Sequence, residues 1–252
     1  MNVARGMPTA VEGVLAVIGP HAQVVSTVHG ASSGPLASDS VKAALSTLGT
    51  SGSSVSTFVP TDATPVQVEL HSLPTACARH NTPTQSHAVY DTLKKLFTGS
   101  QAKHVVLAVP DEHVLASVAA AARAFPAYSH KTSGAEAGSA AVTVYVPASA
   151  SDQDVGNHQV LADSVRLAAA LVDMPCSELN TATFTEVAKH VAEETGASFK
   201  CISGTDLRDG GFGGLWGVGK AAENLPALAI LEWAPEGTAD KPAIVMAGKG
   251  ST

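Results

Sequence analysis

Residues 103–125, KHVVLAVPDEHVLASVAAAARAF, decide the fold class of this chain. The first part, KHVVLAVP, is rich in β-branched residues and ends at a proline, which is typical of a buried strand. In the second part, apolar residues recur every three or four positions from Val114 to Phe125. That spacing predicts a helix with one face packed on a sheet. A strand followed directly by such a helix indicates an α/β domain.

The same alternation runs through the first 150 residues. The patterns predict strands at 14–19, 22–29, 65–73, 103–110 and 141–147, and helices at 38–49, 86–97 and 111–125. Strands interleaved with helices favour a mixed or largely parallel sheet. We therefore expect residues 1–150 to form one α/β domain.

A small, polar stretch, ASASDQDVGN at 148–157, is the best candidate boundary. An apolar helix is expected at 158–174, so we interpret 151–174 as linker and connector helix. A second unit, 175–252, follows. In it Thr183 and Glu186 have the spacing of a capping box, and Gly196 is a favourable helix terminator. Strands are predicted at 197–202, 226–233 and 242–248.

Composition narrows the classes of function. Apolar residues make up 45% of the chain, charged residues 15%, and the formal net charge is −7. Scattered Lys and Arg argue against nucleic-acid binding, and no run is long enough to cross a membrane. The three cysteines, Cys77, Cys176 and Cys201, form no CxxC pair and predict neither a zinc knuckle nor a disulfide framework. We expect a cytoplasmic protein with no nucleic-acid or membrane partner.

Two glycine-rich motifs suggest chemistry that their context does not support. Residues 214–221, GLWGVGKA, fit the GxxxxGK pattern of a phosphate-binding loop, but a polar turn precedes them and Ala221 replaces the hydroxyl that would hold magnesium. Residues 30–34, GASSG, fit the GxSxG pattern of a nucleophile elbow, but Pro35 separates the serine from the next helix. We predict neither a nucleotide site nor a serine nucleophile here.

Four segments of the last third carry a family resemblance when they are taken in order. They are LVDMPCSELNT (171–181), GFGGLWGVGKA (211–221), PALAIL (226–231) and AGKG (247–250). Together they resemble the segments that open the catalytic domain of leucyl aminopeptidases (cytosol aminopeptidases), in an aminopeptidase-like branch. The glycine-rich stretch thus resembles a structural loop of this family.

The resemblance implies a fold and a chemistry. It implies a macro-like α/β domain for residues 1–150 and the first part of an α/β zinc-peptidase-like catalytic domain for 175–252. Family members use two divalent metal ions, Zn²⁺ or Mn²⁺, to activate water and release N-terminal amino acids from peptides. By resemblance, Lys249 is a metal ligand. Peptide substrates and a homo-oligomer, a hexamer in this family, are also implied.

The same resemblance predicts that this chain lacks most of the catalytic site. The next ligand of the family pattern would stand at position 254, past Thr252, and the expected catalytic residues lie further on. One ligand does not hold two metal ions, so we expect the 252-residue chain to be inactive alone and not to bind the ions stably. A non-catalytic binding or assembly subunit, based on the N-terminal domain, is the alternative.

Overall fold

The computed structural model describes residues 1–62, 64–96, 101–130, 141–238 and 240–250. The chain divides into two compact units, Met1–Asp173 and Met174–Thr252, and each is described by itself. Among the described helices, none has the length and apolar character needed to span a membrane.

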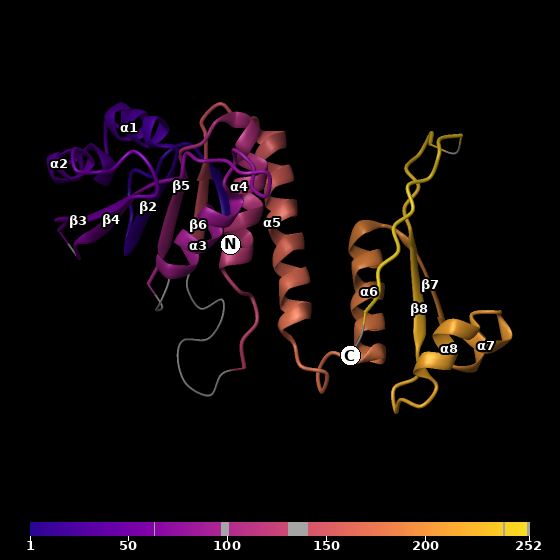
Figure 1. Ribbon diagram of the computed structural model, residues 1–252. Coiled ribbons are helices and arrows are strands. Elements are labelled where there is room, and N and C mark those ends of the chain that lie inside the picture. Colours follow the sequence, from indigo (N-terminus) through magenta and orange to yellow (C-terminus); the bar gives the residue numbers. More distant parts are fainter. Residues whose placement is uncertain (63, 97–100, 131–140, 239, 251–252) are drawn as a thin grey trace. The chain divides into compact units, whose positions relative to one another are not determined.

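The first unit is built on a six-stranded sheet (Figure 1). Its strands are β1 (Asn2–Arg5), β2 (Val14–Gly19), β3 (Ser54–Val59), β4 (Val66–Ser72), β5 (Lys103–Leu107) and β6 (Val142–Val146). The strand order is β1-β6-β5-β2-β4-β3, and all neighbours pair in parallel except β3, which runs antiparallel to β4 at the edge. The expected largely parallel sheet is confirmed.

Helices cover both faces of this sheet. They are α1 (His21–Gly30), α2 (Asp39–Leu45), α3 (Ser86–Leu96), α4 (Asp111–Ala124) and α5 (Asp152–Asp173), with a 3₁₀ turn, η1 (Pro35–Ala37). Side chains of α1 and α2 belong to one buried cluster, and side chains of α3, α4 and α5 belong to another. The unit is therefore a three-layer α/β/α structure.

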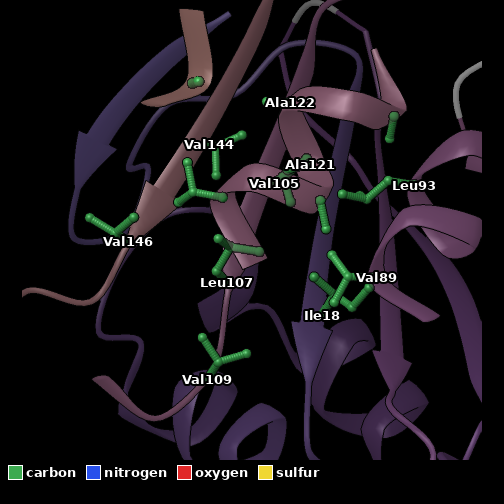
Figure 2. Close-up of a cluster of buried hydrophobic side chains, with 14 of the residues drawn as sticks. Ile18, Val89, Leu93, Val105, Leu107, Val109, Ala121, Ala122, Val144 and Val146 are labelled. Atoms are coloured by element: carbon green, nitrogen blue, oxygen red, sulfur yellow. The ribbon is translucent and has the colours of Figure 1, made fainter. Parts of the chain in front are cut away.

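Alternate residues of β5 belong to the two buried clusters on opposite faces of the sheet. Val105 and Leu107 point to the cluster under α3 and α4 (Figure 2), whereas Val106 belongs to the cluster under α1. Successive strand residues face opposite sides of a sheet, so a continuous apolar run is what a strand covered on both faces needs. Each fully buried Val or Leu contributes about 1.5–3 kcal/mol.

The strand expected at 22–29 is wrong, because these residues form α1. Val24 and Val28 are fully buried and stand one helical turn apart, so the helix buries both on the sheet. The β-branched residues that suggested a strand are the helix's packing face. Sequence reasoning also missed the two outer strands, β1 and β3, which are short and largely exposed or half-buried.

Helix α5 begins at Asp152, inside the stretch expected to be a linker. The Gln159 side chain explains why the helix belongs to the first unit. Its Oε1 accepts a hydrogen bond from Val3 N at 2.7 Å, and its Nε2 donates to Met1 O at 3.0 Å. Arg166 donates to the Phe125 carbonyl at 2.8 Å. The helix thus ties down the edge strand β1 and the end of α4.

The second unit contains α6 (Thr181–Thr195), β7 (Ser198–Ser203), α7 (Thr205–Asp209), α8 (Gly213–Gly219) and β8 (Ala227–Glu232). Strands β7 and β8 form an antiparallel pair. Gly196 ends α6 in the left-handed conformation, as expected. The capping box, however, is formed by Asn180 and Thr183 rather than by Thr183 and Glu186, because the helix starts three residues earlier than the pattern suggested.

The strand expected at 242–248 is also wrong, since the described residues there form no regular element. Ile244, Val245 and Met246 are 85–92% exposed. A strand gains its stability from backbone pairing and from burial of alternate side chains. Neither is present for this segment among the residues that the structure describes.

Candidate metal centre

The four segments that carry the resemblance occupy defined places. Residues 171–181 span the end of α5 and the first residue of α6, and residues 211–221 contain α8. Residues 226–231 are Pro226 and most of β8, and residues 247–250 lie in a stretch without regular structure. The glycines of the GxxxxGK pattern, Gly214 and Gly219, lie within α8. A phosphate loop presents its backbone N–H groups before a helix begins, so this motif does not form one.

Close packing positions the start of β8. A Cβ added at Gly219 would lie 2.4 Å from the Pro226 ring, so only glycine fits at the end of α8. The backbone N–H of Gly204 donates to the Pro226 carbonyl at 2.9 Å. The glycine-rich stretch therefore connects two packed elements, which is the structural role expected for it.

Lys249 lies in the stretch without regular structure that comes after β8, and this residue is exposed. Its neighbour Gly250 passes the first turns of α6, where an added Cβ would lie 3.0 Å from the Phe184 ring. The segment thus runs beside α6. Lys249 does not line the hollow at one end of the sheet of the first unit or the hollow beside the end of α6.

A dinuclear centre needs several donors close together. Across the described residues, no group of three or more His, Cys, Asp or Glu side chains is placed to hold a metal ion. Among the described residues, Lys249 is therefore not part of a group of donors of the kind that a two-metal site requires. The donors of the described residues do not fit the pair of ions.

Sequence reasoning did not predict an apolar hollow of about 520 Å³ beside the end of α6. Thr195, Ala197, Leu231 and Trp233 line it. Trp233 is 70% exposed. A tryptophan directly after the apolar strand sequence is the signal that could have identified this surface.

Two family models match the chain, in the same order as the segments above. Residues 35–134 match the "M17 aminopeptidase N-terminal domain 2", and residues 166–252 match the "Cytosol aminopeptidase family, catalytic domain". The chain belongs to the cytosol aminopeptidase family. The chain therefore contains a part that matches an N-terminal domain of this family and a part that matches its catalytic domain.

Relatives of the chain carry aminopeptidase names. It is 37% identical over 202 residues to the human "Probable aminopeptidase NPEPL1", covering 76% of this chain and 38% of that protein. It is 36% identical over 183 residues to "Leucine aminopeptidase 1" of Caenorhabditis elegans, covering 72% of this chain and 37% of that protein. The chain thus spans less than two fifths of the length of these relatives.

A solved structure gives the same picture of the fold. The leucine aminopeptidase (LAP1) of Caenorhabditis elegans superimposes with a TM-score of 0.74 at 27% identity, covering 94% of this chain and 49% of that one. The mixed α/β architecture of this chain is therefore shared with a solved member of the family.

Proposed function

We propose that the protein containing this chain is a metal-dependent aminopeptidase that releases N-terminal amino acids from peptides. The observation that carries the proposal is the ordered pair of family matches, N-terminal domain first and catalytic domain second. Relatives over 30% identical are named as aminopeptidases.

We also propose that Lys249 is one ligand of the two divalent ions, Zn²⁺ or Mn²⁺, in the complete protein. This role requires a neutral amine, which a neighbouring cation favours by repelling the ammonium proton. Because the described donors do not form a set of their own, the remaining ligands must come from residues other than those. When bound, such ions activate water and polarise the peptide carbonyl.

The experiment compares the 252-residue chain with the complete protein on an aminoacyl anilide. The chain with added Mn²⁺ or Zn²⁺ is expected to show no turnover above background. In the complete protein, Lys249→Ala should lower turnover by more than about 100-fold, because a metal ligand supplies several kcal/mol to the reaction. It should also lower the bound metal measured by elemental analysis.

Lys241→Ala is the matched control, since Lys241 is exposed in the same terminal segment. It should leave both turnover and metal content unchanged. Turnover by the 252-residue chain would show that its own residues suffice. Full metal content and full activity in the Lys249→Ala protein would show that Lys249 is not a metal ligand. If the complete protein is inactive with every metal tested, the aminopeptidase proposal is overturned.

The proposal extends to partners and place of action. Peptides are the substrates, and we propose a homo-oligomer, a hexamer as the family resemblance implies, in the cytoplasm. The exposed apolar residues of the second unit, among them Val218 and Trp233, are consistent with a surface that is covered in an assembly. Sedimentation of the complete protein at the mass of one protomer would contradict this. Co-assembly of the 252-residue chain with a complete subunit would favour the non-catalytic assembly role.

A further inference from the structure

The first unit contains a hollow of about 490 Å³ at one end of its sheet. Four parts of the chain line it: the residues after β1, the exposed side of α1, the passage from β5 into α4, and the residues after β6. All of these lie in the first unit. A volume of this size is typical of sites for small organic molecules.

The topology explains why a hollow forms here. Strands β2 and β5 are neighbours and run in parallel, but β2 leads into α1 and β5 leads into α4. These two helices pack on opposite faces of the sheet. Where neighbouring parallel strands send their helices to opposite faces, a crevice opens at the carboxyl ends, and ligands of α/β proteins bind in it.

The two strands remain joined up to the edge of the crevice. Ala108 N donates to Ile18 O at 2.9 Å, and a Cβ added at Gly19 would lie 1.7 Å from the Ala108 carbonyl oxygen. Glycine at this position lets the two chains touch before they separate. The base of the crevice is thus fixed by backbone contacts.

The lining of the hollow selects a class of ligand. Much of it is apolar, from Val106, Ala108, Val109 and their neighbours, with an amide and two hydroxyls from Gln23, Ser26 and Thr27. Asp111 is the one charged residue among the described residues of the lining. A carboxylate with no nearby Lys, Arg or His in that set repels phosphates and carboxylates and attracts cations.

We propose that this hollow binds a small organic cation, an amine that carries an apolar group. The ammonium pairs with the Asp111 carboxylate, and the apolar group lies on the valine and alanine side chains. Ser149 Oγ donates to Asp111 Oδ1 at 3.0 Å and holds the carboxylate in place. This site lies entirely in the first unit and does not depend on the peptidase activity proposed above.

A different role of Asp111 is to stabilise the first turn of α4 through the helix dipole. Glu112 shares that role, since both acidic residues stand in the first turn, but Glu112 does not line the hollow. Replacing each of the two residues in turn therefore distinguishes an effect on ligand binding from an effect on helix stability.

The test uses the 252-residue chain and three probes of similar size: 2-phenylethylamine, 2-phenylethanol and phenylacetate. Saturation-transfer NMR and calorimetry should show the amine binding with a Kd on the order of 1 mM, as expected for a ligand of this size. The neutral alcohol should bind several-fold more weakly, and the anion should not bind. Equal binding of the anion and the amine, or no binding by any probe, would overturn the proposal.

Variants locate the site. Asp111→Asn should weaken amine binding about three- to fivefold, the effect of losing one exposed ion pair, whereas Glu112→Gln should not. Gly30 lines the hollow and has open space where a Cβ would stand, so Gly30→Leu should fill the hollow and abolish binding. Gly156→Leu, at another open glycine position outside the hollow, is its control.

The melting temperature of each variant is measured alongside binding. If Gly30→Leu does not fold, Ser26→Phe, at an exposed position of α1 in the same lining, replaces it. Unchanged amine binding in a folded Gly30→Leu or Ser26→Phe protein, or in Asp111→Asn, would show that the amine binds elsewhere.

Discussion

The two units of this chain differ in how far they bury their apolar side chains. In the first unit, apolar residues from the four inner strands and five helices form two buried clusters, and the outer strands β1 and β3 add partly buried residues that pack against them. In the second, large apolar side chains remain on the surface: Phe184, Phe212, Leu215, Val218, Leu225, Leu231, Trp233, Ile244, Val245 and Met246 are each at least 37% exposed. Among large aliphatic residues there, Leu207 is fully buried.

The local signals are equally good in both units. Helix α6 has a capping box and a left-handed glycine at its end, and β8 has the apolar sequence ALAILE. Yet no residue of β8 reaches full burial, because the two-stranded sheet and the three described helices of this unit offer too little surface to cover it. Local sequence is sufficient to form these helices and strands. Their apolar faces are buried in a core only where the layers of the fold are complete.

The largest expected difference between the units is in resistance to cleavage. A protease of broad specificity should remove the second unit rapidly and leave an N-terminal fragment that ends near Asp173, because α5 is tied to β1 and α4. Mass spectrometry of the time course gives the fragment ends. A fragment that ends before Asp152, or no stable fragment, would show that the first unit does not hold together as the contacts indicate.

A pair of truncations tests the same contrast at single side chains. Leu15 is fully buried and Val245 is 85% exposed. Leu15→Ala should lower the free energy of unfolding by about 2–5 kcal/mol through lost burial and a cavity, and Val245→Ala should change it by less than about 0.5 kcal/mol. Urea unfolding measures both. Similar losses for the two variants would mean that the second unit buries its valine in solution.

A smaller effect is expected from the helix cap of the second unit. Asn180 Oδ1 accepts hydrogen bonds from Ala182 N at 3.0 Å and Thr183 N at 3.2 Å. Asn180→Ala should cost about 1 kcal/mol of helix stability, seen as roughly fivefold faster amide exchange in the first turn of α6. Ser177→Ala, at an exposed position before the helix, should leave these amides unchanged. If it accelerates them equally, the cap is not the cause.

The apolar pattern predicted a strand correctly where the strand is covered on both faces of the sheet. Predictions that relied on β-branched composition alone were wrong. The continuous run at 14–19 is β2, buried on both sides. Residues 22–29 have similar β-branched content, but Val24 and Val28 bury one helical face. Residues 242–248 have strand composition and no described neighbour to pair with. Pairing partners are a tertiary property, so composition alone does not reveal them.

The candidate sites, too, depend on tertiary neighbours that the sequence does not reveal. The resemblance assigns Lys249 a role, but metal binding requires donors that the described residues do not place beside it. The hollow at the end of β2 and β5 brings together Gln23 and Asp111, which are 88 positions apart and belong to no sequence motif. It follows from strand order, which becomes known only from the structure.

The smallest expected effect concerns pH and lies within the first unit. His104 Nδ1 lies 3.1 Å from the Tyr145 hydroxyl oxygen, and the two rings are stacked with centroids 6.0 Å apart. Burial lowers the pKa of His104, with Glu12 acting in the opposite direction. The unfolded chain therefore takes up this proton at a higher pH than the folded chain does.

Because the unfolded state binds the additional proton, His104 makes stability fall as the pH drops through its unfolded pKa, about 6.5, toward the lower folded value. Replacing it by glutamine should make the melting temperature less dependent on pH between about 7.5 and 5. His29→Gln, at an exposed position of α1, is the matched control. The His104 pKa, followed by NMR, should lie below the ordinary value; a value above it, with an unchanged pH slope in His104→Gln, would show that the imidazole is stabilised in its charged form.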